Sequence, residues 1–195
     1  MKAKIYNFAD IDINCIAAAL KIGAAAVLPT DTVYGLCAAA PEKINKIKNN
    51  PPGKPPQVLC TIAQAFKLAA PSPQFTAAAK LWPGALTLIA AVSPEGRKLM
   101  GGEGTIGLRV PDDEFILSLI QKIKAPLFAS SANIHGAPVC ETEAAVKEVF
   151  ETAADIIVLR GDIKTAPSAV IDFSGPQAKI IRPGALSENV LKQLK

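Results

Sequence analysis

The sequence predicts an α/β fold, a single domain over residues 1–195 with a twisted, mixed, open sheet and flanking helices. Apolar residues at helical spacing intermix with short apolar runs typical of buried strands, and the links between them are short. A chain of 195 residues can bury a full core as one domain. Half of the residues are hydrophobic and 19% are charged, a composition that argues against extensive disorder.

Charge and cysteine content narrow the classes of partner. The formal net charge of +4 is mild, so it permits a nucleotide or RNA partner without requiring one. The four cysteines are far apart and His135 is the only histidine, which argues against a metal site made by protein side chains. The cysteines are typical of reduced thiols, and no apolar run could span a bilayer. We therefore expect a soluble, cytoplasmic protein that does not contact a membrane.

In the first half of the chain, strands are predicted from short apolar runs and helices from apolar residues three or four apart. Gly23 is expected to end the first helix, and Pro41 to begin the second. The expected elements in order are an edge strand at 5–8, a helix around 13–20, a buried strand at 24–28, a short helix from 41, an apolar run at 57–62, helices at 66–70 and 75–81, and a strand at 85–92.

A polar, glycine-rich stretch at 93–104 follows and is expected to be a mobile surface loop. The next strand ends at Pro111, and Asp112 is placed to cap the helix after it. The remaining elements in order are a strand at 105–110, a helix at 113–123, a strand at 126–129, a polar loop at 130–136, a helix at 142–151, strands at 155–159, 167–172 and 178–182, and a closing helix from 187.

Polar residues gather directly after the buried strand at 24–28. Pro29 ends that strand and Gly35 permits a tight turn, with two threonines, an aspartate and a tyrosine between them. Ligands of open α/β sheets usually bind in loops that follow strands. A turn whose side chains only satisfy local backbone groups would explain the same residues, so the stretch alone does not decide.

Three further features are compatible with an anion site. Arg109 and Arg182 each end an apolar strand, and a buried cation is costly unless a salt bridge or an anionic ligand pairs with it. The stiff, proline-rich loop at 48–56 carries two lysines and is either a solvated linker or the rim of a site. The Ser/Asn loop at 130–136 suits phosphate or ribose, although an ordinary turn has the same composition.

These features fall into motifs that occur in one order at characteristic gaps. Together they resemble the YrdC-type threonylcarbamoyl-AMP synthase family over roughly residues 20–185. The motifs are Thr30-Asp31-Thr32-Val33-Tyr34-Gly35, the loop from Lys48, Trp82-Pro83-Gly84, Arg109-Val110-Pro111, Ser131-Ala132-Asn133, Ser168 and Arg182-Pro183-Gly184.

The resemblance implies a nucleotidyltransferase, an L-threonylcarbamoyladenylate synthase. Such an enzyme makes threonylcarbamoyl-AMP and pyrophosphate from L-threonine, bicarbonate and ATP, for threonylcarbamoyladenosine modification of tRNA. The implied fold is a YrdC-like α/β domain with a concave basic surface, and Mg²⁺ is expected to accompany ATP. Because the family is linked to double-stranded RNA binding, tRNA, double-stranded RNA and other tRNA-modification proteins are candidate partners.

The resemblance also assigns residues to two substrates. For threonine it implies Thr32, Arg109 and Ser168, with the backbone at Ala129 close by, and Arg109 would pair with the carboxylate. For ATP it implies Lys48, Asn50, Lys54, Thr105, Ser131, Asn133, Arg182 and the backbone at Val139. No side-chain nucleophile is required, because threonine's amine takes up bicarbonate and the carbamate attacks the α-phosphate.

One position departs from the family. Its loop normally reads Lys-x-Arg-Pro, whereas this chain has Asn50 in place of the arginine. A hydrogen bond to a charged group contributes about 1.5–3 kcal/mol, so its loss could slow the reaction roughly 10- to 100-fold. Lys46 or Lys54 could compensate, and Ala169, where threonine is common, is a milder change. The alternatives are a catalytically weak module that binds nucleotide or double-stranded RNA, and another acyl-adenylate or carbamoyl enzyme.

Overall fold

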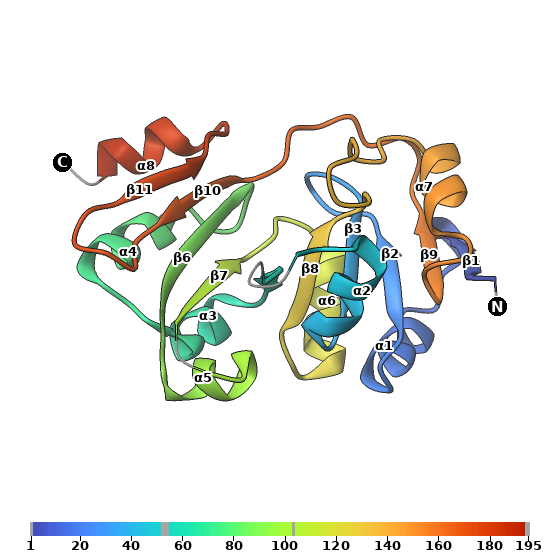
Figure 1. Ribbon diagram of the computed structural model, residues 1–195, viewed down its shortest axis with the longest axis horizontal. Coiled ribbons are helices and arrows are strands. Elements are labelled where there is room, and N and C mark those ends of the chain that lie inside the picture. The colour runs from blue at the N-terminus through green and yellow to red at the C-terminus, as the bar shows by residue number, and fades with distance from the viewer. Residues whose placement is uncertain (1, 52–54, 103, 194–195) are drawn as a thin grey trace. The chain divides into compact units, whose positions relative to one another are not determined.

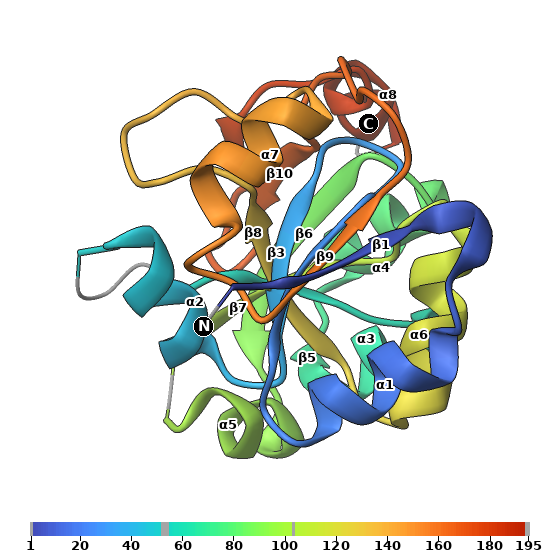
Figure 2. The ribbon, with the colours of Figure 1, turned by 90° about the vertical axis from the view of Figure 1, so that its right-hand side faces the viewer.

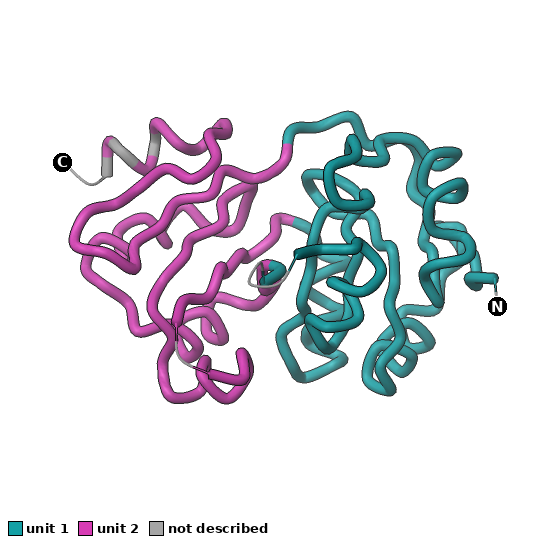
Figure 3. The backbone as a smooth tube through the Cα atoms, in the orientation of Figure 1, with its two compact units in different colours: residues 1–56, 113–166 teal, residues 57–112, 167–195 magenta. Residues whose placement is uncertain are grey.

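The computed structural model describes residues 2–51, 55–102 and 104–193. The chain divides into two compact units, each assembled from two separate segments (Figure 3). Unit 1 comprises Met1–Pro56 and Asp113–Ala166, and unit 2 comprises Gln57–Asp112 and Pro167–Lys195. Each unit combines strands with helices (Figure 1), in agreement with the predicted α/β class.

Unit 1 contains strands that run in both directions. Their order is β1 (Lys4–Asn7), β9 (Ile156–Leu159), β2 (Ala25–Leu28), β3 (Gly35–Ala38) and β8 (Leu127–Ser131). β9 is parallel to both β1 and β2, whereas β3 is antiparallel to both β2 and β8. Every residue of β2, β3 and β9 is buried, which explains why their sequences are apolar without alternation.

Helices cover both faces of the unit 1 strands. α1 (Ile13–Lys21) packs against α6 (Glu114–Ile123) on one side, while α2 (Pro41–Lys48) and α7 (Glu143–Phe150) lie on the other (Figure 2). A 3₁₀ turn, η1 (Phe8–Asp10), links β1 to α1. The buried residues Ile116, Leu119, Ile120 and Ile123 recur at helical spacing along α6.

Unit 2 is also mixed. Its strands are β4 (Gln57–Leu59), β7 (Thr105–Arg109), β6 (Leu86–Val92), β10 (Ala169–Asp172) and β11 (Lys179–Arg182), in that order. The short strand β5 (Ala69–Ala70) pairs with β6. The helices are α3 (Ile62–Leu68), α4 (Pro73–Ala78), α5 (Pro94–Met100) and α8 (Ser187–Gln193), with a 3₁₀ turn, η2 (Ala79–Leu81).

The prediction of a surface loop at 93–104 is wrong, because most of this stretch forms α5. The Ser93 side chain caps this helix by accepting a hydrogen bond from the Gly96 N–H at 3.0 Å, and Pro94 occupies its first turn. Gly101 ends it in the left-handed conformation. Capping residues at both ends therefore define a helix whose glycine content suggested a loop.

Four smaller expectations also need correction. Gly35 lies outside any tight turn, since it begins β3, and the polar stretch after β2 therefore joins two antiparallel strands. Ala69 and Ala70 form β5 instead of ending a helix. Asp113 caps α6, because its Oδ1 accepts a hydrogen bond from the Ile116 N–H. Ser130 and Ser131 belong to β8, where they pair with β3.

Candidate functional site

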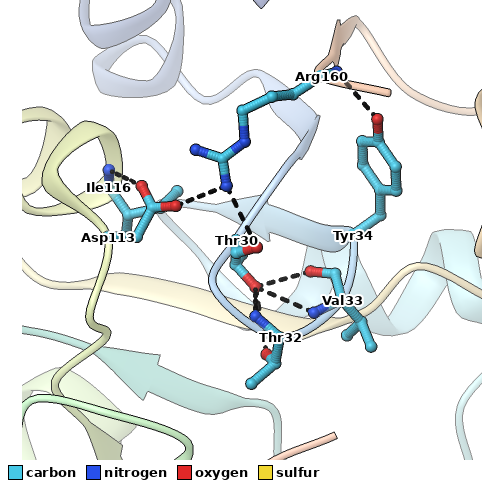
Figure 4. Close-up of polar contacts among 7 residues, drawn as sticks. All are labelled: Thr30, Thr32, Val33, Tyr34, Asp113, Ile116 and Arg160. Atoms are coloured by element: carbon cyan, nitrogen blue, oxygen red, sulfur yellow. Dashed lines mark hydrogen bonds and ion pairs between the residues drawn. The ribbon is translucent and has the colours of Figure 1, made fainter. Parts of the chain in front are cut away.

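The polar residues after β2 form a compact turn held by one hydroxyl group (Figure 4). Thr30 Oγ1 donates to the Val33 carbonyl at 2.7 Å and accepts from the N–H groups of Thr32 at 3.2 Å and Val33 at 3.3 Å. It also lies 3.2 Å from Thr32 Oγ1. Both threonines are buried, so the turn is a defined structure.

The last residue of α2 connects two of the predicted ATP residues. Lys48 is 4% exposed, and its Nζ donates to the Ser131 carbonyl at 2.6 Å, the Asn133 carbonyl at 2.7 Å and Asn133 Oδ1 at 2.7 Å. Ser131 Oγ donates to the same Asn133 Oδ1 at 2.7 Å. Lys48, Ser131 and Asn133, predicted as one group although they are far apart in the sequence, therefore lie in direct contact.

This Lys48 cluster, Lys48 with Ser131 and Asn133, is also tied down by its neighbours. Asn133 Nδ2 donates to the Ala137 carbonyl at 2.8 Å, and the His135 N–H donates to the Lys48 carbonyl at 2.8 Å. The oxygens of these three contacts are two backbone carbonyls and one side-chain amide. The Lys48 ammonium is thus buried against the loop that follows β8.

Asn50, at the departure from the family pattern, turns back toward α2. Its Nδ2 donates to Asn45 Oδ1 at 2.9 Å, and its backbone N–H donates to the Asn45 carbonyl at 3.0 Å. Lys46, the first of the two compensating cations considered, is exposed on the same helix. Lys54, the second, lies outside the described residues. Asn50 therefore has a local structural partner and brings no positive charge of its own.

In unit 2, Arg109 ends β7 and is 2% exposed. Its Nε donates to the Gly84 carbonyl at 3.2 Å, and the Gly84 N–H donates to the Val110 carbonyl at 2.9 Å. The Trp82-Pro83-Gly84 motif thus supports the guanidinium through its backbone. Thr105 begins the same strand and is exposed, about 13 Å from Arg109 at the rise of an extended chain.

Ser168 belongs to a chain of hydrogen bonds in which each hydroxyl donates to the next residue, from Ser168 to Thr87 and from Thr87 to Gln57. Thr87 Oγ1 donates to Gln57 Oε1 at 2.7 Å and lies 2.8 Å from Ser168 Oγ, so Ser168 must be the donor to Thr87. Arg182 donates from Nε to the Ser168 carbonyl at 2.9 Å and from Nη2 to Ser168 Oγ at 3.2 Å. Ser168, predicted for threonine, and Arg182, predicted for ATP, are therefore direct neighbours.

The predicted residues divide between the units. Of the threonine set, Thr32 and Ala129 belong to unit 1, and Arg109 and Ser168 to unit 2. The described residues of the ATP set are Lys48, Asn50, Ser131, Asn133 and Val139 in unit 1, and Thr105 and Arg182 in unit 2. Val139 is half-buried and precedes Cys140, whose N–H donates to the Ala132 carbonyl at 2.9 Å. The assignment of all these residues to substrates stays a prediction.

Sequence reasoning missed several residues of these networks. Thr87 and Gln57 support Ser168, and Arg160 with Asp113 supports the turn that holds Thr32. A signal for Arg160 was present, because it directly follows an apolar strand, as Arg109 and Arg182 end theirs. For Thr87 the only sequence signal was a hydroxyl group within an apolar strand. For Gln57 the sequence contained no signal.

The three buried cysteines do not add a nucleophile to the Lys48 cluster or to the hydrogen bonds around Ser168. Burial raises the pKa of the Cys37 and Cys60 thiols to about 12, so both stay protonated at neutral pH. Burial also raises the pKa of Cys140. Within the part of the chain that the structure describes, no three His, Cys, Asp or Glu residues are placed to share a metal ion. None of the helices in that part is long and apolar enough to cross a membrane.

Comparison with known proteins gives consistent relatives. A protein from Pyrococcus abyssi named threonylcarbamoyl-AMP synthase is 32% identical over 184 residues, which cover 89% of this chain and 54% of the relative. A protein of the same name from Bacillus subtilis is 36% identical over 139 residues, 66% of this chain and 40% of the relative. The chain thus spans about half the length of these curated relatives.

A solved structure and a family model agree with these relatives. The structure titled as P. abyssi Sua5 complexed with L-threonine superposes with a TM-score of 0.87 at 31% identity, covering 98% of this chain and 61% of that one. The family model Sua5_yciO_yrdC, described as Telomere recombination, matches residues 18–184. This match spans most of the chain and includes every motif from Thr30 to Gly184. The chain belongs to the Sua5/YciO/YrdC family.

Proposed function

We propose that this protein is an L-threonylcarbamoyladenylate synthase that makes threonylcarbamoyl-AMP and pyrophosphate from L-threonine, bicarbonate and ATP. The observation that carries the proposal is the Lys48 cluster, in which three residues predicted for ATP meet around one buried ammonium. Family membership, and relatives named for this activity, support the same reaction. The L-threonine complex of P. abyssi Sua5 supports threonine as the amino acid.

The proposed chemistry depends on binding and charge. Threonine's amine adds to bicarbonate and water leaves, which gives a carbamate; a carbamate oxygen then attacks the α-phosphorus, and pyrophosphate leaves. Arg109 would bind the threonine carboxylate, and Lys48 and Arg182 would face phosphate charge. The described residues hold no cluster of metal ligands. We therefore propose that Mg²⁺ enters bound to the phosphates of ATP.

The test is release of pyrophosphate from ATP by the purified chain, with threonine and bicarbonate each supplied or omitted. We expect release only when both are present, with the adenylate product identified by its mass. Serine in place of threonine is the matched control, because it keeps the hydroxyl and lacks one methyl group. Release that ignores either substrate would contradict the proposed reaction.

A second candidate is a nucleotide-binding module with weak turnover, and Asn50 favours it. Its amide pairs with Asn45 where the family pattern has an arginine, so one expected phosphate contact is missing. Saturable ATP binding without threonine-dependent pyrophosphate release would support this candidate. The same module could bind tRNA or double-stranded RNA, in which case RNA affinity should fall steeply as salt is added.

A further inference from the structure

Arg160, the residue that follows β9, contacts the turn that carries Thr32 (Figure 4). Its Nη2 donates to Asp113 Oδ2 at 2.7 Å and to the Thr30 carbonyl at 3.3 Å. The guanidinium carbon also lies 4.8 Å from the centroid of the Phe8 ring, within the range of a cation–π contact. The guanidinium is therefore held from three directions, and one of its contacts is the backbone of the turn.

The backbone of Arg160 holds the other end of the same turn. Its N–H donates to Tyr34 Oη at 3.0 Å, and Tyr34 Oη donates to the Gly161 carbonyl at 2.6 Å. Tyr34 is fully buried, and burial is the main reason that its pKa is raised, so its hydroxyl keeps its proton. One residue thus fixes Thr30 through its side chain and Tyr34 through its main chain.

Asp113 fixes the position of the arginine in turn. Its side chain is 4% exposed, and its second oxygen caps α6 by accepting from the Ile116 N–H at 3.0 Å. A buried carboxylate is costly without a partner, so Arg160 and Asp113 stabilise each other. Arginine suits this place because its Nη2 carries two N–H groups, so one nitrogen can donate to the carboxylate and to the carbonyl.

We propose that Arg160 is a positioning residue for threonine use: by clamping residues 30 and 34 it sets where the Thr32 hydroxyl lies. This role rests on the proposed function, in which Thr32 contacts threonine. Within the turn, Thr30 connects the clamp to Thr32 through the 3.2 Å contacts of its hydroxyl. Loss of the clamp should therefore disturb threonine binding and leave the Lys48 cluster in place.

The test compares Arg160→Met, which keeps length without charge, with Lys164→Met. Lys164 is an exposed cation four residues further on, 3.9 Å from Asp162. We expect Arg160→Met to raise the threonine KM roughly 10-fold, the loss of one hydrogen bond to a charged group, with the ATP KM near its wild-type value. Lys164→Met should change neither. Arg160→Lys, which keeps the charge without the planar fork, should recover part of the loss.

Asp113→Asn separates the ion pair from the helix cap, because asparagine caps helices as well as aspartate does. We expect it to raise the threonine KM in the same direction as Arg160→Met. The double variant should lose less than the product of the two single effects, since both remove one contact. Hydrogen exchange at the amides of Thr32 and Val33 should be faster in Arg160→Met than in Lys164→Met.

Two outcomes would overturn the positioning role of Arg160 without contradicting the proposed function. In one, folded Arg160→Met keeps the wild-type threonine KM or the wild-type exchange at Thr32 and Val33. In the other, it loses ATP and threonine use equally, which would indicate a general structural defect. A wild-type chain without threonine-dependent turnover would instead overturn the proposed function and this role with it.

Discussion

At Asn50 a single side chain decides between the two candidate functions. The Asn50 amide pairs with Asn45 and carries no charge, whereas an arginine there could reach phosphate oxygens with two N–H groups. We predict that Asn50→Arg raises the rate of threonine-dependent pyrophosphate release, roughly 10- to 100-fold if it restores one charged hydrogen bond. Steady-state kinetics at saturating substrates would measure it.

Asn50→Gln is the matched control for this prediction, because it lengthens the side chain without adding charge. It should leave the rate close to that of the wild type. An Asn50→Arg enzyme with an unchanged rate would mean that another cation already supplies the charge. Lys46, exposed on α2, could then be tested by Lys46→Met.

Arg109 leads to a prediction about the binding of threonine compared with that of ATP. Arg109 is 2% exposed and its Nε donates to the Gly84 carbonyl, so its guanidinium is held in one orientation within unit 2. We predict that Arg109→Ala lowers kcat/KM for threonine roughly 10- to 100-fold and changes ATP binding much less. Titration calorimetry with each substrate would separate the two affinities.

Removal of a buried arginine can also unfold the strand, so Arg109→Lys is measured beside Arg109→Ala. Lysine keeps the charge and loses the fork, and it should retain part of the threonine affinity. Equal loss of ATP and threonine affinity in a folded Arg109→Ala protein would contradict the assignment of this residue to threonine.

Comparison of individual helices and strands shows which parts of the fold the sequence predicts well. β2, β3 and β9 are buried throughout, and two of their three apolar runs were predicted within one residue. β8 was placed too short, because Ser130 and Ser131 resemble a loop, and only pairing with β3 makes them strand. Local composition therefore fails where tertiary pairing determines the conformation.

α5 shows the opposite failure, since its signals were local and were outweighed by glycine content. Ser93 and Pro94 mark a helix start and Gly101 a helix end, yet Gly96 lies inside the helix. Gly96 is there for packing: a Cβ at this position would come closer than 3.0 Å to the Leu68 carbonyl oxygen. This requirement depends on α3, so the sequence of α5 alone does not disclose it.

This packing leads to a prediction for Gly96→Ala. Helix propensity alone would make the change stabilising by about 1 kcal/mol, but the clash with fixed backbone should instead cost about 1–3 kcal/mol. Gly102→Ala is the matched control, because nothing lies within 4 Å of a Cβ there. Urea denaturation should show a lower free energy of unfolding only for Gly96→Ala. A stabilised Gly96→Ala protein would mean that α3 and α5 separate easily.

At the scale of the whole molecule, the division into two units was not predicted. Each unit is assembled from two separate segments, and the proline-rich loop that ends at residue 56 was interpreted as a linker or the rim of a site, without a domain boundary. The predicted site residues are likewise spread over the chain, and only the motif order of a known family indicated that they act together. Whether residues 1–195 fold as one domain stays a prediction.

Cooperative unfolding tests that prediction, because Trp82 is the only tryptophan and lies in unit 2. Trp82 is buried, with its ring 5.8 Å from that of Phe75, so its fluorescence reports unit 2. Ile16, fully buried in α1, belongs to unit 1. If the chain is one cooperative domain, Ile16→Val should lower the urea midpoint of Trp82 fluorescence, since it costs about 1 kcal/mol.

Ile22→Val is the matched control, because Ile22 follows the same helix and is 88% exposed. It should leave the midpoint unchanged by both fluorescence and far-UV circular dichroism. In one domain the two probes also give coincident transitions for the wild type. An Ile16→Val protein whose circular dichroism shifts while its Trp82 fluorescence does not would show that unit 2 unfolds independently. The chain would then contain two domains.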